Sequence, residues 1–316
     1  VLAYAAAAWM MLKVGFQHGA INSQQSWFFR GSMIRYNVGY ITDKILHPPT
    51  RDIIMPRLGF TGVGMAAMGK IPVVNTYAVF AALRACEQMR TFVAYPNLNV
   101  KIAVSHGGLA VGWDGVTHQG LEDMSIVRAI PNMTIVHPAD AVSTKKLLPQ
   151  LIAHNGPVYF RLGRNPAPVL YAEDRPVTMG KAEVLAEGGD VTIVACGLMV
   201  SESLKAVRLL RESGVGARLL DMHAIKPLDA AAVIDSAALT GALVTAEDNT
   251  ILGGLGSAVA ETLAENCPAP LRRIGVRDCF GESGDPAALF EKYEMSAAHI
   301  AAAAESAIAA KQGRRK

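Results

Sequence analysis

Residues 105–123 read SHGGLAVGWDGVTHQGLED and combine proton-handling side chains with five glycines in one short stretch. The side chains that carry the chemistry are His106, Asp114 and His118. Glycine permits backbone conformations closed to other residues and lets a ligand approach the main chain, so the stretch indicates a loop built around a bound molecule. The alternative interpretation is a polar surface loop whose histidines are merely solvated.

Short runs rich in β-branched residues alternate with helical segments on both sides of this loop. Strands are predicted at 71–77, 100–105, 133–138, 157–163, 190–197, 217–222, 242–248 and 271–277. Helices are predicted at 78–95, within 125–130 and 144–154, and at 201–213, 228–239, 256–266 and 286–293. A proline-rich linker at 165–176 separates two halves. This alternation predicts an α/β protein of two doubly wound domains with mostly parallel sheets, divided into residues 1–172 and 173–316.

The composition of the chain argues against several classes of function. The chain has 316 residues, of which 51% are hydrophobic, and a net charge of +3, which gives no reason to expect a nucleic-acid partner. The four cysteines form no C-x-x-C pair, so we expect a reducing, cytoplasmic setting and no metal site built from them. The apolar opening at 1–16 has no basic residue before its apolar run and is short for a spanning helix. It is therefore interpreted as an amphipathic or buried helix, without a membrane role.

A second glycine cluster, Gly253 to Gly256, follows the strand ALVTAED and opens a helix. It does not keep the G-x-G-x-x-G spacing of dinucleotide-binding loops and follows a late strand. We expect these glycines to serve close helix–strand packing.

The motifs of the first half resemble a known family. The pattern is His106, then V-G-x-D-G-x-T-H-Q ending at Gln119, then RAIPNMTIVHPADA at 128–141. It resembles the pyrimidine-binding domain of transketolases, thiamine-diphosphate enzymes that move two-carbon ketol units between sugars. The likeness covers roughly 62–300 and is greatest to the separately encoded C-terminal half of a split transketolase. It implies a pyrimidine-binding domain at 1–172, of which 1–61 are unlike the family, and a transketolase C-terminal domain at 173–316.

The resemblance assigns roles to individual residues. His106 and His118 match family residues that hydrogen-bond or move protons at the sugar carbonyl and hydroxyls, which suits imidazole because its pKa lies near operating pH. Asp114 matches the residue that recognises a hydroxyl group of the donor sugar. Arg164 matches the arginine that grips a substrate phosphate, with Arg161 as a possible substitute.

Cofactor contacts are implied in the same way. Tyr77 and Phe80 match the aromatic residues that pack on the pyrimidine ring of thiamine diphosphate, although ordinary core aromatics would also fit a strand-to-helix junction.

The chain departs from the family at two places. It has no G-D-G motif with a downstream Asn, so Mg²⁺ and the diphosphate are expected on a separate N-terminal subunit that shares the cofactor with this chain. The family glutamate upstream of Tyr77 is also missing: an ungapped count reaches Met55, and residues 1–61 contain no Glu. Residues 1–61 are interpreted as either divergent or frame-shifted.

The expected function is that of the C-terminal subunit of a split transketolase, a transferase of pentose phosphate metabolism acting on sugar phosphates within a cytoplasmic heterotetramer. One alternative is a non-catalytic or impaired partner subunit that cannot activate thiamine. A second is an enzyme like deoxyxylulose-phosphate synthase, which shares the D-G-x-T-H string. A third is a beta subunit of a 2-oxoacid dehydrogenase, a class that lacks the V-G-x-D-G-x-T-H-Q string. The sequence does not identify the sugars or the partner.

Overall fold

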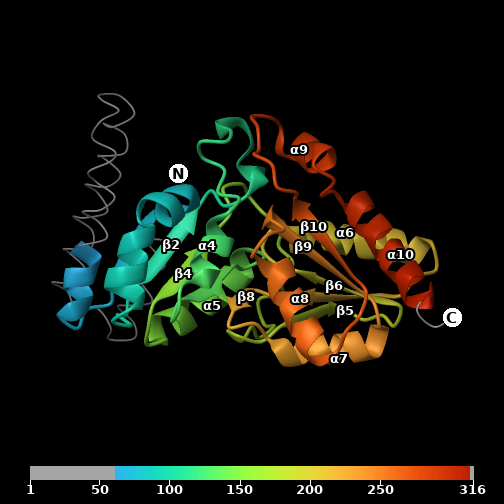
Figure 1. Ribbon diagram of the computed structural model, residues 1–316, viewed down its shortest axis with the longest axis horizontal. Helices are drawn as coiled ribbons and strands as arrows, with labels where there is room; N and C mark the ends of the chain where they lie inside the picture. Colours follow the sequence, from blue (N-terminus) through green and yellow to red (C-terminus); the bar gives the residue numbers. More distant parts are fainter. Residues whose placement is uncertain (1–60, 314–316) are drawn as a thin grey trace.

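Two five-stranded sheets form the framework of the computed structural model, which describes residues 61–313 (Figure 1). The first sheet has the order β1-β2-β4-β3-β8, with bounds Val73–Tyr77, Lys101–Ser105, Val158–Arg161, Thr134–Val136 and Ala224–Lys226. The second has the order β10-β9-β6-β7-β5, with bounds Leu271–Val276, Leu243–Thr250, Val191–Ala195, Ala217–Asp221 and Glu183–Ala186. All pairings are parallel except β8 with β3 and β5 with β7. The predicted α/β class with mostly parallel sheets is confirmed.

Helices cover both faces of each sheet. They are η2 (Phe80–Arg84), η3 (Gln88–Ala94), η4 (Leu109–Asp114), α4 (Asp123–Ala129), α5 (Ala141–Ala153), α6 (Met199–Glu212), α7 (Ala230–Thr240), α8 (Leu255–Asn266), α9 (Pro286–Lys292) and α10 (Ala297–Gly313). Around the second sheet, α6 and α10 lie on one face and α7 and α8 on the other (Figure 1). No helix within residues 61–313 is long and apolar enough to cross a membrane.

The alternation of side chains along a strand explains the two-sided covering. In β2, Ile102 and Val104 belong to the buried cluster that includes η3 and α4, whereas Ala103 belongs to the cluster that includes α5. Successive strand residues point to opposite faces, so a strand buried on both sides carries apolar residues on both faces. The cluster of Ala103 also contains Ile193 of β6, so one apolar core runs through both halves of the chain.

Several elements differ from the prediction. The helix expected at 78–95 is divided into two π-helical segments, η2 and η3. The sequence prediction missed α10, whose sequence AAHIAAAAESAIAAKQG is so rich in alanine that polar and apolar residues show no clear helical period. It also missed β8, a three-residue strand from the second half that joins the first sheet antiparallel to β3.

The glycine cluster before α8 serves packing, as predicted. A Cβ on Gly254 would lie 2.0 Å from Glu247 Oε2, and one on Gly256 would lie 2.8 Å from Thr245 Oγ1. The Glu247 carboxylate accepts hydrogen bonds from the Leu255 and Gly256 amides, both at 2.8 Å. Glycine therefore allows a buried carboxylate of β9 to cap the first turn of α8.

Candidate active site

The glycine-rich loop lies at the carboxyl edge of the first sheet. Tyr77, the last residue of β1, is in register with Ser105, the last residue of β2, so the residues that follow both strands emerge side by side. The Gly108 amide donates to the Gly120 carbonyl at 2.6 Å, and the Gly120 amide donates to the His106 carbonyl at 3.2 Å. These two bonds close the loop and bring its histidines to one place.

His106 is held in a constrained, buried position. Its φ is 59°, a left-handed backbone conformation that is uncommon for residues other than glycine. Residues in such conformations are found preferentially at functional sites. Its Nδ1 shares a hydrogen bond of 2.6 Å with Ser105 Oγ, and its ring stacks on Tyr77 with centroids 3.8 Å apart. Burial, with a contribution from the Arg164 charge, lowers the pKa of His106 to about 4. The imidazole is therefore neutral at physiological pH, with one nitrogen able to donate and the other to accept.

Asp114 links His106 to Arg164. Its Oδ2 lies 3.8 Å from His106 Nε2 and 3.4 Å from Arg164 Nε. The Arg164 guanidinium also donates to the Val111 carbonyl at 3.4 Å. The Arg164 side chain is 36% exposed and that of Asp114 31%, so both polar groups reach solvent at the mouth of the site.

Aromatic rings join His118 to the same cluster. The His118 ring lies edge-on to Tyr77 and Phe80, with centroids 5.7 and 5.6 Å apart, and its Nδ1 lies 2.9 Å from Thr117 Oγ1. Tyr77 and Phe80 stack with centroids 5.6 Å apart and are both half-buried. The structure thus brings together all six residues selected from the sequence: Tyr77, Phe80, His106, Asp114, His118 and Arg164.

Arg161 does not lie at the mouth of the site. Its side chain is fully buried beneath the loop and donates to both carboxylate oxygens of Asp123, at 2.9 and 3.0 Å. It also donates to the Gly120 and Asp248 carbonyls, both at 3.0 Å. Burial disfavours its charge, but Asp123 keeps the pKa of Arg161 above its ordinary value. The expectation that Arg161 could substitute for Arg164 is wrong, because its donors are already engaged inside the protein.

Sequence reasoning missed the carboxylate that supports the loop from the second half of the chain. Asp248 of β9 accepts hydrogen bonds from the Leu109 amide at 2.6 Å and the Ala110 amide at 3.1 Å. The available signal was a pair of adjacent acids, Glu247 and Asp248, at the end of the predicted strand ALVTAED. The sequence analysis placed all its candidate site residues in the first half of the chain.

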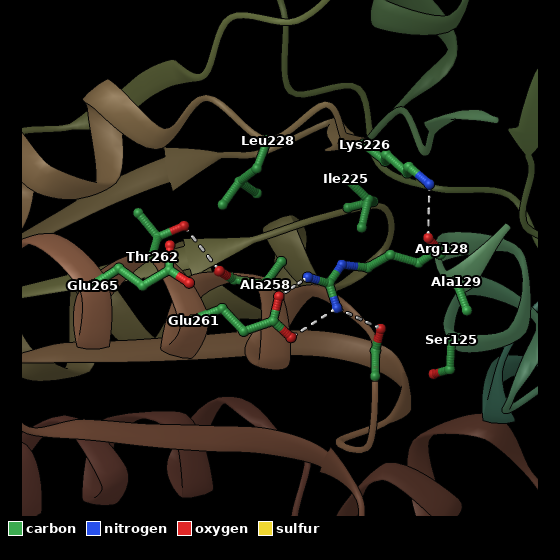
Figure 2. Close-up of a pocket in the computed structure, with 11 residues that line it drawn as sticks. Ser125, Arg128, Ala129, Ile225, Lys226, Leu228, Ala258, Glu261, Thr262 and Glu265 are labelled. Atoms are coloured by element: carbon green, nitrogen blue, oxygen red, sulfur yellow. Dashed lines mark hydrogen bonds and ion pairs between the residues drawn. The ribbon is translucent and has the colours of Figure 1, made fainter. Parts of the chain in front are cut away.

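A separate hollow lies between α4, β8 and α8 (Figure 2). Two of its charged side chains are engaged with each other and one with the backbone: Arg128 pairs with Glu261, and Lys226 Nζ donates to the Arg128 and Ile130 carbonyls at 2.8 and 2.6 Å. The residues that line it include none of the six site residues. Within residues 61–313, no three His, Cys, Asp or Glu side chains are grouped as a metal site.

Comparison with known proteins agrees with this geometry. The family model of the transketolase pyrimidine-binding domain matches residues 58–168, and that of the transketolase C-terminal domain matches residues 180–300. The 6-deoxy-6-sulfo-D-fructose transketolase subunit SqwH of Clostridium sp. (strain MSTE9) is 51% identical over 241 residues, which cover 76% of this chain and 75% of that protein. An apulose-4-phosphate transketolase subunit of Phocaeicola vulgatus is 41% identical over 233 residues, covering 73% of this chain and 74% of that protein.

A solved structure has the same architecture. It is a split-gene transketolase described as an inactive β4 tetramer, and it is 45% identical with a TM-score of 0.77 over 81% of this chain and 82% of that one. The chain belongs to the transketolase family, and its relatives include subunits of split transketolases.

Proposed function

We propose that this chain is the C-terminal subunit of a thiamine-diphosphate-dependent transketolase that transfers a two-carbon ketol unit between phosphorylated ketose and aldose sugars. The observation that carries the proposal is the convergence of His106, Asp114, His118 and Arg164 beside the Tyr77–Phe80 stack. We assign residues 1–172 to the pyrimidine-binding domain and 173–316 to the C-terminal domain.

The two histidines supply proton transfer in this proposal. Because His106 is neutral and its Nδ1 is paired with Ser105 Oγ, its Nε2 is the nitrogen that donates to or accepts from a sugar oxygen, according to the tautomer. The His118 ring packs edge-on against the same Tyr77 ring on which His106 stacks.

Asp114 and Arg164 bind the substrate. Asp114 accepts from a donor hydroxyl, and the half-exposed Arg164 guanidinium pairs with a phosphate at the mouth of the site.

We assign the pyrimidine side of the thiamine diphosphate site to Tyr77 and Phe80. The half-buried rings of Tyr77 and Phe80 fit the stacking surface that an aminopyrimidine needs. Tyr77 and Phe80 would hold the cofactor's aminopyrimidine, and the bound cofactor would supply the carbanion stabilisation that ketol transfer requires. No acidic residue occurs in β1 or η2, and the position of the missing family glutamate, Met55, lies outside the described residues.

The proposal includes a separate N-terminal subunit that holds the diphosphate and Mg²⁺, in a cytoplasmic heterotetramer of pentose phosphate metabolism. Support comes from two relatives that are themselves named as transketolase subunits.

Reconstitution tests this function. The chain mixed with an N-terminal subunit that carries G-D-G and the downstream Asn is expected to transfer ketol units, while either chain alone is inactive. By calorimetry, the chain alone should bind thiamine diphosphate weakly even with Mg²⁺, because its described residues supply no metal cluster. Tight binding by the chain alone would contradict the shared site.

The absent glutamate favours a second candidate, an impaired partner subunit. If the mixture binds cofactor but does not turn over, replacing residues 50–61 with a family-like segment that includes Met55→Glu is expected to restore turnover. Full activity before the replacement, with no gain after it, would exclude this candidate.

Arg164→Ala tests the phosphate contact. We expect the Michaelis constant for phosphorylated sugars to rise about ten- to a hundredfold, since a charge-assisted contact contributes roughly 1.5–3 kcal/mol. Non-phosphorylated sugars should be little affected. Arg211→Ala, at an exposed position of α6, is the control. Equal losses for both sugar types would show that Arg164 does not bind phosphate.

A further inference from the structure

The loop that carries the site residues is held in place by hydrogen bonds to the second half of the chain. Asp248 lies on β9 and is 2% exposed, and its carboxylate accepts hydrogen bonds from the Leu109 and Ala110 amides at 2.6 and 3.1 Å. These amides begin η4, the turn that ends at Asp114. The residue before η4, Gly108, has no side chain to cap it, so the carboxylate of a distant strand supplies the cap.

The backbone around this contact is shaped for it. Gly108 has φ of 94°, and a Cβ there would lie 2.1 Å from Asp248 Oδ2. A Cβ on Gly107 would lie 2.3 Å from the Arg161 guanidinium. Arg161 in turn donates to the Asp248 carbonyl at 3.0 Å. The loop therefore rests directly on two fixed charged groups, and only glycine permits that approach.

Other bonds from the second half act on the same loop. Gln119 Nε2 donates to the Glu282 carbonyl at 2.8 Å, and Ser283 Oγ donates to the Trp113 carbonyl. The Thr250 amide donates to the Leu121 carbonyl at 2.7 Å. Figure 1 shows α9 beside this loop, in agreement with its packing against η4.

We infer that Asp248 is a positioning residue for catalysis: it holds η4 so that Asp114 stays opposite His106 and Arg164. Asp114 lies at the end of η4, five residues after Leu109 and beyond a kink at Gly112, so the anchored first turn fixes the start of the segment that carries the carboxylate. The catalytic consequence rests on the proposed function, whereas the anchoring itself does not.

Glu247 offers a matched control. It is the neighbouring residue, is also fully buried, and also accepts two backbone amides, but those amides begin α8 inside the second half. Asp248→Asn and Glu247→Gln each replace a buried capping carboxylate with an amide of about the same size. A general loss of stability would affect both variants alike.

Amide hydrogen exchange provides the first measurement. In the wild-type chain, the Leu109 and Ala110 amides should be strongly protected although they lie in a loop. In Asp248→Asn their exchange should accelerate at least about tenfold, as expected from loss of about 1.4 kcal/mol or more. In Glu247→Gln the accelerated amides should be those of Leu255 and Gly256 instead. Unprotected Leu109 and Ala110 in the wild-type chain would overturn the inference, even if the Asn variant failed to fold.

Steady-state kinetics of the reconstituted enzyme provide the second measurement. Asp248→Asn is expected to lower kcat at least tenfold for every ketose donor whose hydroxyl hydrogen-bonds to Asp114. Glu247→Gln should change kcat less than threefold. Both variants are compared at a temperature where both are folded. Equal kcat in the two variants would reduce Asp248 to a structural role. If the wild-type complex transfers no ketol unit, the proposed function fails, while the exchange measurement still decides whether Asp248 anchors the loop.

Discussion

Arg161→Met is expected to lower the free energy of unfolding by about 3–5 kcal/mol, the range for breaking a buried ion pair by removing one partner. The Arg161 and Asp123 side chains are both fully buried, and methionine leaves the Asp123 carboxylate without its cation. The Gly120 and Asp248 carbonyls each lose the hydrogen bond from Arg161 at the same time. Because domains are stabilised by only about 5–15 kcal/mol, a large fraction of the total is lost. Urea unfolding followed by circular dichroism measures the change.

Two variants separate this effect from a mere loss of charge. Arg164→Met removes the same kind of side chain at a half-exposed position, and we expect it to change the unfolding free energy by less than about 1 kcal/mol. Arg161→Met combined with Asp123→Leu removes both buried charges and should recover part of the loss. If the two single arginine variants were equally stable, the buried network would contribute little to the fold.

His118→Ala is expected to lower kcat of the reconstituted enzyme roughly 10²- to 10⁴-fold, the usual contribution of a positioned proton-transfer group. Its ring lies within 5.7 Å of Tyr77 and Phe80, on the same wall as His106. Since proton transfer occurs in the transition state, kcat and kcat/KM should fall together while KM changes little. Steady-state kinetics with a phosphorylated ketose donor and an aldose acceptor measure both constants.

The control is His299→Ala, which removes a histidine of α10, and its kinetics should match the wild-type chain. A rise in KM alone for His118→Ala would assign this histidine to substrate binding. Unchanged kinetics would leave it a structural residue that packs on the aromatic rings.

The sequence by itself predicted most of the strands and the six candidate residues that the structure brings together. Strands such as β2 are apolar on both faces, and that composition is visible without coordinates. The candidate site residues could be predicted from the sequence because they lie near the ends of neighbouring parallel strands or within one closed loop. Tyr77 and Ser105 are in register, and the Gly108–Gly120 bond closes the segment that carries both histidines.

The tertiary structure alone decided what lies beneath that loop. Arg161 and Arg164 are three residues apart in one motif, yet one is fully buried and the other is 36% exposed. Which of the two reaches solvent depends on packing against Asp123 and Asp248. The contact from Asp248 to Leu109 spans 139 residues, and β8 joins β3 across a comparable separation. Such pairings arise from burial of the two halves against each other, so no local propensity or spacing encodes them.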